Sequence, residues 1–281
     1  MKSYCIKTNN NQIIKYLLNK FKILNFANIY YCNKSFCKYE NFIMHYLEDD
    51  IESFDNIVCD IVTNIIIDFY EEKIIKKIIN VNYFYFETNE KLLIYDNCLN
   101  FLDEQREEIF ENLFINIKKY IKENKRIYID GIVNFRLNDY IKRIDNIVDL
   151  GVNQYIIEKE YKEFISLLKI YVNSSKANTK LIHLVYVNGE SILLDEEKNF
   201  IKLDNNINTI QYLSDISFSS NDIALNTLLS ILPSKIEIHI IDKNDEFINT
   251  LKLIFEDRVK ICNDCNICRT YRKINEMKIS K

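Results

Sequence analysis

The first 46 residues alternate between short extended segments and one amphipathic stretch. Apolar residues at helical spacing predict a helix over about residues 12–24. Three short runs rich in Tyr and Ile are typical of strands, at Tyr4–Ile6, Ile29–Cys32 and Tyr39–His45. This pattern predicts a small α/β unit at the start of the chain.

The middle of the chain has the hydrophobic period of helices. Apolar residues recur at helical spacing over about residues 51–79 and again over residues 109–121. A short extended segment, Arg126–Ile129, precedes a long helical pattern over about residues 134–171. The apolar stripe of this long helix changes near Gly151, which predicts a bend or a change of packing partner.

After a polar stretch at residues 173–178, strands and helices alternate. The pair Asn188-Gly189 separates two apolar runs and favours a type I′ hairpin. The predicted elements are strands at 182–187 and 191–194, a helix at 221–232, a strand at 236–241, a helix at 245–255 and a strand at 258–262. The order strand, helix, strand implies a parallel pair joined by a right-handed crossover.

These elements predict an α+β fold with two regions. We expect a mainly helical N-terminal region over residues 1–175, which begins with the small α/β unit. A C-terminal α/β domain over residues 176–281 carries the hairpin and the βαβ crossover and ends in a cysteine-containing tail. A chain of 281 residues is long enough for one large domain or two smaller ones.

Composition excludes some functions without defining one. With 48% hydrophobic and 28% charged residues, the chain can bury a globular core. It contains 3 Gly, so neither G-x-G-x-x-G nor a P-loop can be written, and these nucleotide-binding loops are excluded. The net charge of -4 argues against a protein that binds nucleic acid or anionic lipid over its whole surface.

The chain has no sequence signal for export or membrane insertion. Its N-terminus lacks the apolar region of a secretory signal, and no apolar stretch approaches the roughly 18 residues that a membrane span needs. We therefore expect a soluble, cytoplasmic protein. In that reducing compartment its 8 cysteines are expected to be thiols or metal ligands rather than disulfides.

The sharpest chemical signal is the spacing Cys262-x-x-Cys265-x-x-Cys268. Two-residue gaps let successive thiolates converge on zinc or on an iron–sulfur cluster. A ferredoxin-type run would continue with a fourth cysteine and a proline, which are absent here, so the cluster is the weaker assignment. His239, on the preceding strand, is the candidate fourth ligand of a structural Cys3His zinc site. The alternative is a group of free thiols that pack near the chain end.

Four charged residues of the long helix are candidate interaction or buried ion-pair residues: Arg136, Arg143, Glu158 and Glu160. The simpler interpretation is a solvated helix face, because Glu158 and Lys162 have the i,i+4 spacing of a surface ion pair. Glu158 also continues an apolar stripe. If it is buried, it needs a partner, and Arg136 or Arg143 is the candidate.

Acid–base chemistry has few candidates in this chain. Of the 3 histidines, His183 and His239 lie in apolar strand sequences, where a hydrogen-bonded core histidine is the commoner role. No G-x-S-x-G elbow is present, and no nucleophile is paired with a base at a recognisable spacing. We therefore expect a protein that is not an enzyme.

The tail from Arg269 to Lys281 carries five basic residues against one acidic residue, Glu276. Such a tail suits contact with nucleic acid or with an acidic protein surface. A solvated chain terminus is the simpler interpretation.

Three segments together resemble a known family. The run GIVNFRLNDYIKRIDNIVDLGVNQYIIEKEYKEFISLLKIYV, Gly131–Val172, resembles the most recognisable segment of the YtxC-like proteins. Asn221–Ile240 and Ile254–Cys268 resemble the C-terminal blocks of that family. The resemblance implies a role in sporulation in endospore-forming Firmicutes, and it implies no established reaction.

The sequence therefore favours a non-catalytic cytoplasmic factor that acts in sporulation through contacts with a protein partner. The first alternative is a metal-binding (zinc or iron–sulfur) or thiol-redox module built on Cys262, Cys265 and Cys268, in contact with nucleic acid. The second alternative is an uncharacterised enzyme.

Overall fold

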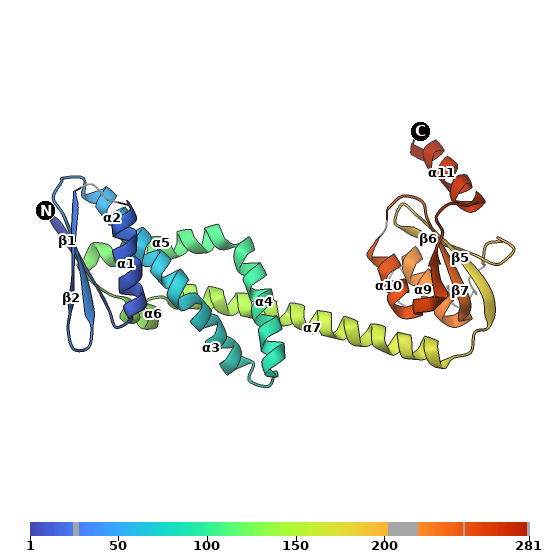
Figure 1. Cartoon of the computed structure of the whole chain (residues 1–281), viewed down its shortest axis with the longest axis horizontal. Coiled ribbons are helices and arrows are strands. Elements are labelled where there is room, and N and C mark those ends of the chain that lie inside the picture. The colour runs from blue at the N-terminus through green and yellow to red at the C-terminus, as the bar shows by residue number, and fades with distance from the viewer. Residues whose placement is uncertain (25–27, 202–218, 244, 280–281) are drawn as a thin grey trace. The chain divides into compact units, whose positions relative to one another are not determined.

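A computed structural model describes residues 1–24, 28–201, 219–243 and 245–279 (Figure 1). The chain divides into two compact units, Met1–Glu158 and Lys159–Lys281. The long helix α7 (Asn138–Ser174) contributes residues to both units. The domain boundary expected at residue 175 lies directly after the last residue of α7.

The first unit contains a four-stranded mixed sheet. Its strands are β1 (Lys2–Thr8), β2 (Ile29–Ser35), β3 (Glu40–Tyr46) and β4 (Arg126–Tyr128), in the order β2-β3-β1-β4. β1 runs antiparallel to β3 and parallel to β4. Alternate residues such as Tyr4, Ile6 and Phe42 are buried, as expected for a sheet with one covered face. They pack against α1 (Asn11–Leu24) and the helices that follow.

The helices of the first unit are α2 (Ile51–Ile66), a π-helical turn (Ile67–Glu71), α3 (Glu72–Asn82), α4 (Thr88–Glu104), α5 (Arg106–Glu123) and α6 (Ile129–Phe135), followed by α7. They include the helices predicted over residues 51–79 and 109–121, together with α4 and α6, which the periodicity had not marked. The expected long helix is two helices, because the chain leaves helical geometry at the cap residue Arg136 and resumes it at Asn138. From Asn138 onward α7 is continuous, including at Gly151.

The second unit contains another four-stranded mixed sheet. Its strands are β5 (Thr179–Val187), β6 (Glu190–Leu194), β7 (Pro233–Ile240) and β8 (Val259–Ile261), in the order β6-β5-β7-β8. The helices are α9 (Ser220–Ile231), α10 (Glu246–Phe255), a 3-10 turn (Glu256–Arg258) and α11 (Asn266–Ile279). The predicted α+β fold is confirmed, with its hairpin and its parallel strands β5, β7 and β8.

The hairpin between β5 and β6 turns at Asn188 and Gly189. Both residues have positive φ, 53° and 81°. Positive φ at the two central positions defines the type I′ turn, which Asn-Gly adopts readily because glycine has no Cβ to clash.

The two faces of the second sheet are covered unequally. On one face Ile182, Leu184 and Ile238 are fully or almost fully buried, in a core built with α9, α10 and the end of α7. On the other face a small cluster joins Val185 and Leu194 to Ile267 of α11. This second, weakly covered face carries the cysteine tail.

Within the ranges that the structure describes, every helix is too short or too polar to cross a lipid bilayer.

Candidate metal centre

Three cysteines lie where β8 leads into α11. The backbone N–H of Cys262 donates to the carbonyl of Ile238 at 2.8 Å, so pairing with β7 continues to this residue. Cys265 directly precedes α11, and its carbonyl accepts a 3.0 Å hydrogen bond from the backbone N–H of Arg269. Cys268 lies in the first turn of the helix. The spacing of three residues places the Cys265 and Cys268 thiols on one side of the helix N-terminus.

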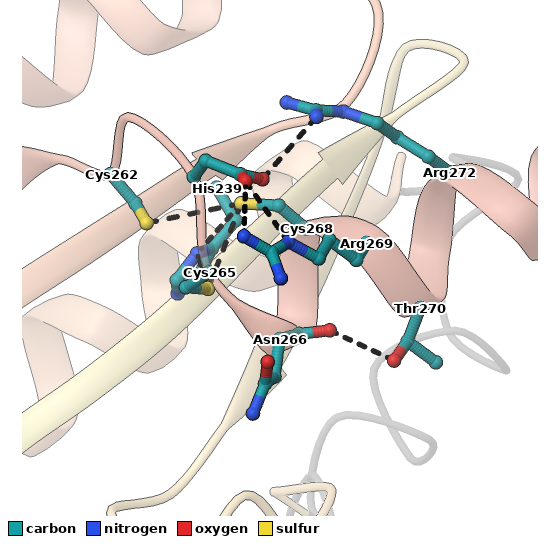
Figure 2. Close-up of polar contacts among 9 residues, drawn as sticks. His239, Cys262, Cys265, Asn266, Cys268, Arg269, Thr270 and Arg272 are labelled. Atoms are coloured by element: carbon teal, nitrogen blue, oxygen red, sulfur yellow. Dashed lines mark hydrogen bonds and ion pairs between the residues drawn. The ribbon is translucent and has the colours of Figure 1, made fainter.

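His239 of β7 extends toward the same point (Figure 2). Its Nδ1 atom is 3.4 Å from Sγ of Cys265 and 3.4 Å from Sγ of Cys268. Sγ of Cys268 is 3.8 Å from Sγ of Cys265 and 3.9 Å from Sγ of Cys262. All four potential ligand atoms lie within 4.8 Å of one another.

These separations match the edges of a tetrahedron around one ion. Zn–S bonds of about 2.3 Å and Zn–N bonds of about 2.05 Å place tetrahedral ligands about 3.8 Å apart for two sulfurs and about 3.5 Å apart for sulfur and nitrogen. The observed distances of 3.8, 3.9 and 3.4 Å are close to these values. The cysteines are free thiols, at nearly twice the roughly 2.05 Å of a disulfide bond.

Local electrostatics make Cys265 the first thiol to ionise. Burial opposes its ionisation, but hydrogen bonds from the backbone N–H groups of Cys268 and Ile267 and from the neighbouring thiols lower its pKa below the usual value. Burial raises the pKa of Cys262 to about 12, and the two neighbouring thiols add to this shift. Burial likewise raises the pKa of Cys268. A cation at their centre would favour the ionised form of all three sulfurs.

The imidazole of His239 is suited to act as a ligand. Its side chain is buried, and burial is the main reason that its pKa lies below the usual value. A neutral imidazole has one nitrogen with a free lone pair, which is the form that binds metals.

Helix α11 has little hydrophobic support of its own. Of the described residues, the cluster beneath it buries Val185, Leu194 and Ile267, with partial cover from Tyr271 and others. Three buried side chains stabilise a 14-residue helix weakly against fraying. A metal ion held by β7, the segment after β8 and α11 would cross-link these elements where the apolar core is small.

Asp264 secures the segment between the first two cysteines. Its Oδ2 accepts a 3.0 Å hydrogen bond from Nε of Arg269, and Nη1 of Arg272 lies 3.4 Å from its Oδ1. These contacts hold the turn Cys262–Cys265 against the first two turns of α11. The simpler interpretation of the basic tail was a solvated chain terminus. In the structure the tail is helical up to Ile279, and Lys281 lies outside the described residues.

Two further polar residues approach the site from the sheet. His183 of β5 is 6% exposed, and its Nδ1 is 3.0 Å from Nε2 of His239. Oε2 of Glu237 is 3.4 Å from the same nitrogen of His183. His183 lies in an apolar strand sequence and is the hydrogen-bonded core residue expected there, but its position beside the cysteine site was not predicted. For Glu237 the sequence carried a signal, because residues two apart on a strand share a face, so Glu237 lies on the same face as His239.

The four charged residues singled out on the long helix do not gather at one place. Arg143 binds Glu108, with Nη1 to Oε1 at 2.7 Å, rather than Glu158. Glu158 is half-buried and accepts a 2.8 Å hydrogen bond from Gln154. Arg136 is exposed at the end of α6, and Glu160 is exposed on α7. This arrangement fits the solvated-face interpretation.

Comparison with known proteins identifies relatives of this chain. A family model described as the YtxC-like family matches residues 56–260, which include His239 and end just before Cys262. A protein of Bacillus subtilis (strain 168), described as uncharacterized protein YtxC, is 21% identical over 204 residues, which cover 68% of this chain and 71% of the relative. No solved structure matches the chain significantly. Because the family model spans most of its length, this chain belongs to the YtxC-like family.

Proposed function

We propose that this protein binds one zinc ion through His239, Cys262, Cys265 and Cys268, and that the ion fastens α11 to the C-terminal sheet. The observation that carries this proposal is the convergence of the four ligand atoms within 4.8 Å, from β7, the residue after β8, and the start of α11. His239 is brought to the three cysteines by the pairing of β7 with β8, so close spacing along the chain does not explain the geometry.

The geometry favours a single ion over the alternatives. In a [4Fe–4S] cluster each cysteine binds a different iron, so the sulfurs lie farther apart than two bonds to one ion allow. In a [2Fe–2S] cluster the four ligands divide between two irons, so they do not all converge on one point. Sulfur–sulfur distances of 3.8 and 3.9 Å correspond to a shared ion. A thiol-redox module needs two cysteines poised near disulfide distance, and four convergent ligands exceed that need. Three sulfurs and one imidazole are typical of zinc.

A site with four protein ligands is structural rather than catalytic. Catalytic zinc keeps one coordination position open for water or substrate, whereas Cys3His sites are closed. We therefore propose a non-catalytic cytoplasmic protein that acts in sporulation through protein contacts, the context that the family resemblance implies. Exposed apolar side chains on α7, such as Phe164, Leu167 and Ile170, support a role in protein contacts.

The metal proposal is tested by element analysis of the full chain purified without oxygen. We expect one zinc per chain in the wild type and a large loss in Cys265→Ser, because this substitution removes one of the four convergent ligands. Cys37→Ser is the matched control, since Cys37 is an exposed free thiol. Wild-type protein without stoichiometric metal, or equal metal content in both variants, would contradict the proposal.

The sporulation proposal has its own readout. Deletion of the gene in the bacterium that carries it should lower the yield of heat-resistant spores, and the wild-type gene should restore it. Rescue by Cys37→Ser without rescue by Cys265→Ser would connect this role to the zinc site. An unchanged spore yield after deletion would show that the protein acts elsewhere.

A further inference from the structure

A second buried histidine, His183, lies directly behind His239, one of the proposed zinc ligands. His183 and His239 stand on the adjacent parallel strands β5 and β7, with Nδ1 of His183 3.0 Å from Nε2 of His239. The strand register pairs His183 with Glu237, two residues from His239, so the three side chains share one face of the sheet. Their ligand-type atoms lie within 4.8 Å of one another.

The two nitrogens of His239 therefore face different partners. Nδ1 faces the sulfurs of Cys265 and Cys268, and Nε2 faces His183. A neutral imidazole carries one proton, and the nitrogen that binds a metal must be the one without it. When Nδ1 binds the ion, the proton must be on Nε2, which then donates to Nδ1 of His183.

We propose that His183 is the positioning residue of the zinc site: it accepts the Nε2–H of His239 and so holds that ring in the Nδ1-binding tautomer. This inference rests on the proposed zinc function. A metal-binding histidine generally donates its second N–H to an acceptor that fixes its orientation, and loss of such an acceptor costs about 10- to 100-fold in metal affinity.

The 3.0 Å contact allows either ring to donate, so a bound metal fixes the direction of this hydrogen bond. Without metal, the proton between Nδ1 of His183 and Nε2 of His239 can belong to either ring. With metal, each ring carries its proton on Nε2 and the bond runs from His239 to His183. Each imidazole keeps one proton throughout, so the protons released on metal binding come from the thiols.

Both rings are buried. His183 is 6% exposed and His239 is 1% exposed. Oε2 of Glu237 lies 3.4 Å from Nδ1 of His183, so this carboxylate and Nε2 of His239 face the same nitrogen. Two neutral rings 3.0 Å apart share one hydrogen bond, which has two possible directions.

The first test compares the zinc affinity of three full-length variants by competition with a chromophoric chelator. His183→Leu removes the acceptor and should weaken zinc binding by about 10- to 100-fold. His183→Gln retains a carbonyl acceptor and should restore most of that loss. His45→Gln is the matched control, because His45 is bound to Ser3 in the first unit. Equal affinity in His183→Leu and wild type would overturn the inference.

A second measurement separates positioning from packing. The chain has 3 histidines, so imidazole nitrogen NMR spectra of His45→Gln report on the remaining pair alone. In the zinc-loaded protein we expect His239 bound through Nδ1, with the protons of both rings on Nε2. Zinc bound through Nε2 of His239, or a proton on Nδ1 of His183 in the zinc-loaded protein, would overturn the inference, whereas a packing role alone would leave the tautomer of His183 independent of metal.

Failure of this inference differs from failure of the zinc proposal. If wild-type protein binds no zinc, both fail together. If wild type binds one zinc and its cobalt form shows thiolate charge-transfer bands, a wild-type affinity in His183→Leu removes the positioning role alone. Two ions per chain, with the second lost in Glu237→Gln, would show that His183, Glu237 and His239 form a metal site of their own and would also overturn it.

Discussion

Gly151 shows how one missing side chain sets a helix contact. A Cβ atom at this position would lie 2.6 Å from Sγ of Cys98, 3.2 Å from the backbone nitrogen of Cys98 and 3.2 Å from the carbonyl oxygen of Ile94. The glycine therefore lets α7 approach the backbone of α4 closely. α7 stays continuous past Gly151, and its packing partner changes farther along, from the first core up to Ile156 to the second core from Ile165.

Gly151→Ala should destabilise the protein although alanine is the better helix former. The gain in helix propensity is about 1 kcal/mol, whereas forcing a methyl group into a packed backbone contact costs about 1–3 kcal/mol. We expect a net decrease in the free energy of unfolding of the first unit, measured by urea denaturation.

Gly131→Ala is the control for this substitution. Its Cβ would lie 2.7 Å from Cδ1 of Tyr128, the end of a side chain that can turn away. Gly131→Ala should therefore cost less than Gly151→Ala. Adding Cys98→Ala should recover part of the loss in Gly151→Ala, because it removes the closest atom. If Gly151→Ala were more stable than the wild type, α7 and α4 could move apart to accept the methyl group, and the close contact at Gly151 would not be required.

At the scale of elements, a buried carboxylate joins three helical segments of the first unit. Glu71, the last residue of the π-helical turn, is 6% exposed. Its Oε1 is 2.7 Å from Nη1 of Arg106 on α5, and its Oε2 accepts a 2.7 Å hydrogen bond from the hydroxyl of Tyr140 on α7. Burial, followed by the nearby carboxylate, raises the pKa of Tyr140, so this hydroxyl stays protonated and donates.

Tyr140→Phe should lower the free energy of unfolding by about 1.5–3 kcal/mol, the usual contribution of a hydrogen bond to a charged group. The substitution leaves one carboxylate oxygen of Glu71 without its donor in a buried site. Equilibrium urea denaturation measures the change.

Tyr83→Phe provides the comparison, because the Tyr83 hydroxyl donates to Asp149 on the exposed surface. Water replaces a lost partner there, so we expect a change below about 0.5 kcal/mol. Similar losses in the two variants would mean that burial of the Glu71 carboxylate does not strengthen its hydrogen bond.

At the scale of the whole molecule, the chain has separate cores. The large cluster of the first unit includes residues from β1 to α7, up to Ile156. The clusters of the second unit begin with Ile165 and include the strands β5 and β7. Units with separate cores can unfold in separate transitions. The proposed zinc ion belongs entirely to the second unit.

Removal of metal should therefore destabilise one unit alone. After treatment with a zinc chelator, we expect faster amide hydrogen exchange over residues 259–279 and a lower unfolding temperature for the second transition. The exchange rates of α2 and α5 should stay unchanged. Uniform loss of protection along the chain would contradict this division, and so would protection of α11 that is independent of metal.

Hydrophobic period predicted most elements because it depends on neighbours a few residues apart. The helix α1, the hairpin with Asn188 and Gly189, and the order of strands and helices from β5 to β8 all follow from local pattern. Local pattern missed the interruption at Arg136 that separates α6 from α7. It also did not show that β4 joins β1 in one sheet, because this pairing brings together Cys5 and Arg126, which lie far apart along the chain.

For the candidate site, the sequence alone determined the kind of chemistry, and the tertiary structure decided its geometry. The two-residue gaps among Cys262, Cys265 and Cys268 indicate a metal-binding motif, because thiols at that spacing converge within one turn of chain. The approach of His239 depends on the pairing of β7 with β8, and the contact with His183 depends on the register of β5 and β7. Register is set by packing across the whole sheet, so residues 56 positions apart along the chain meet only when the fold is complete.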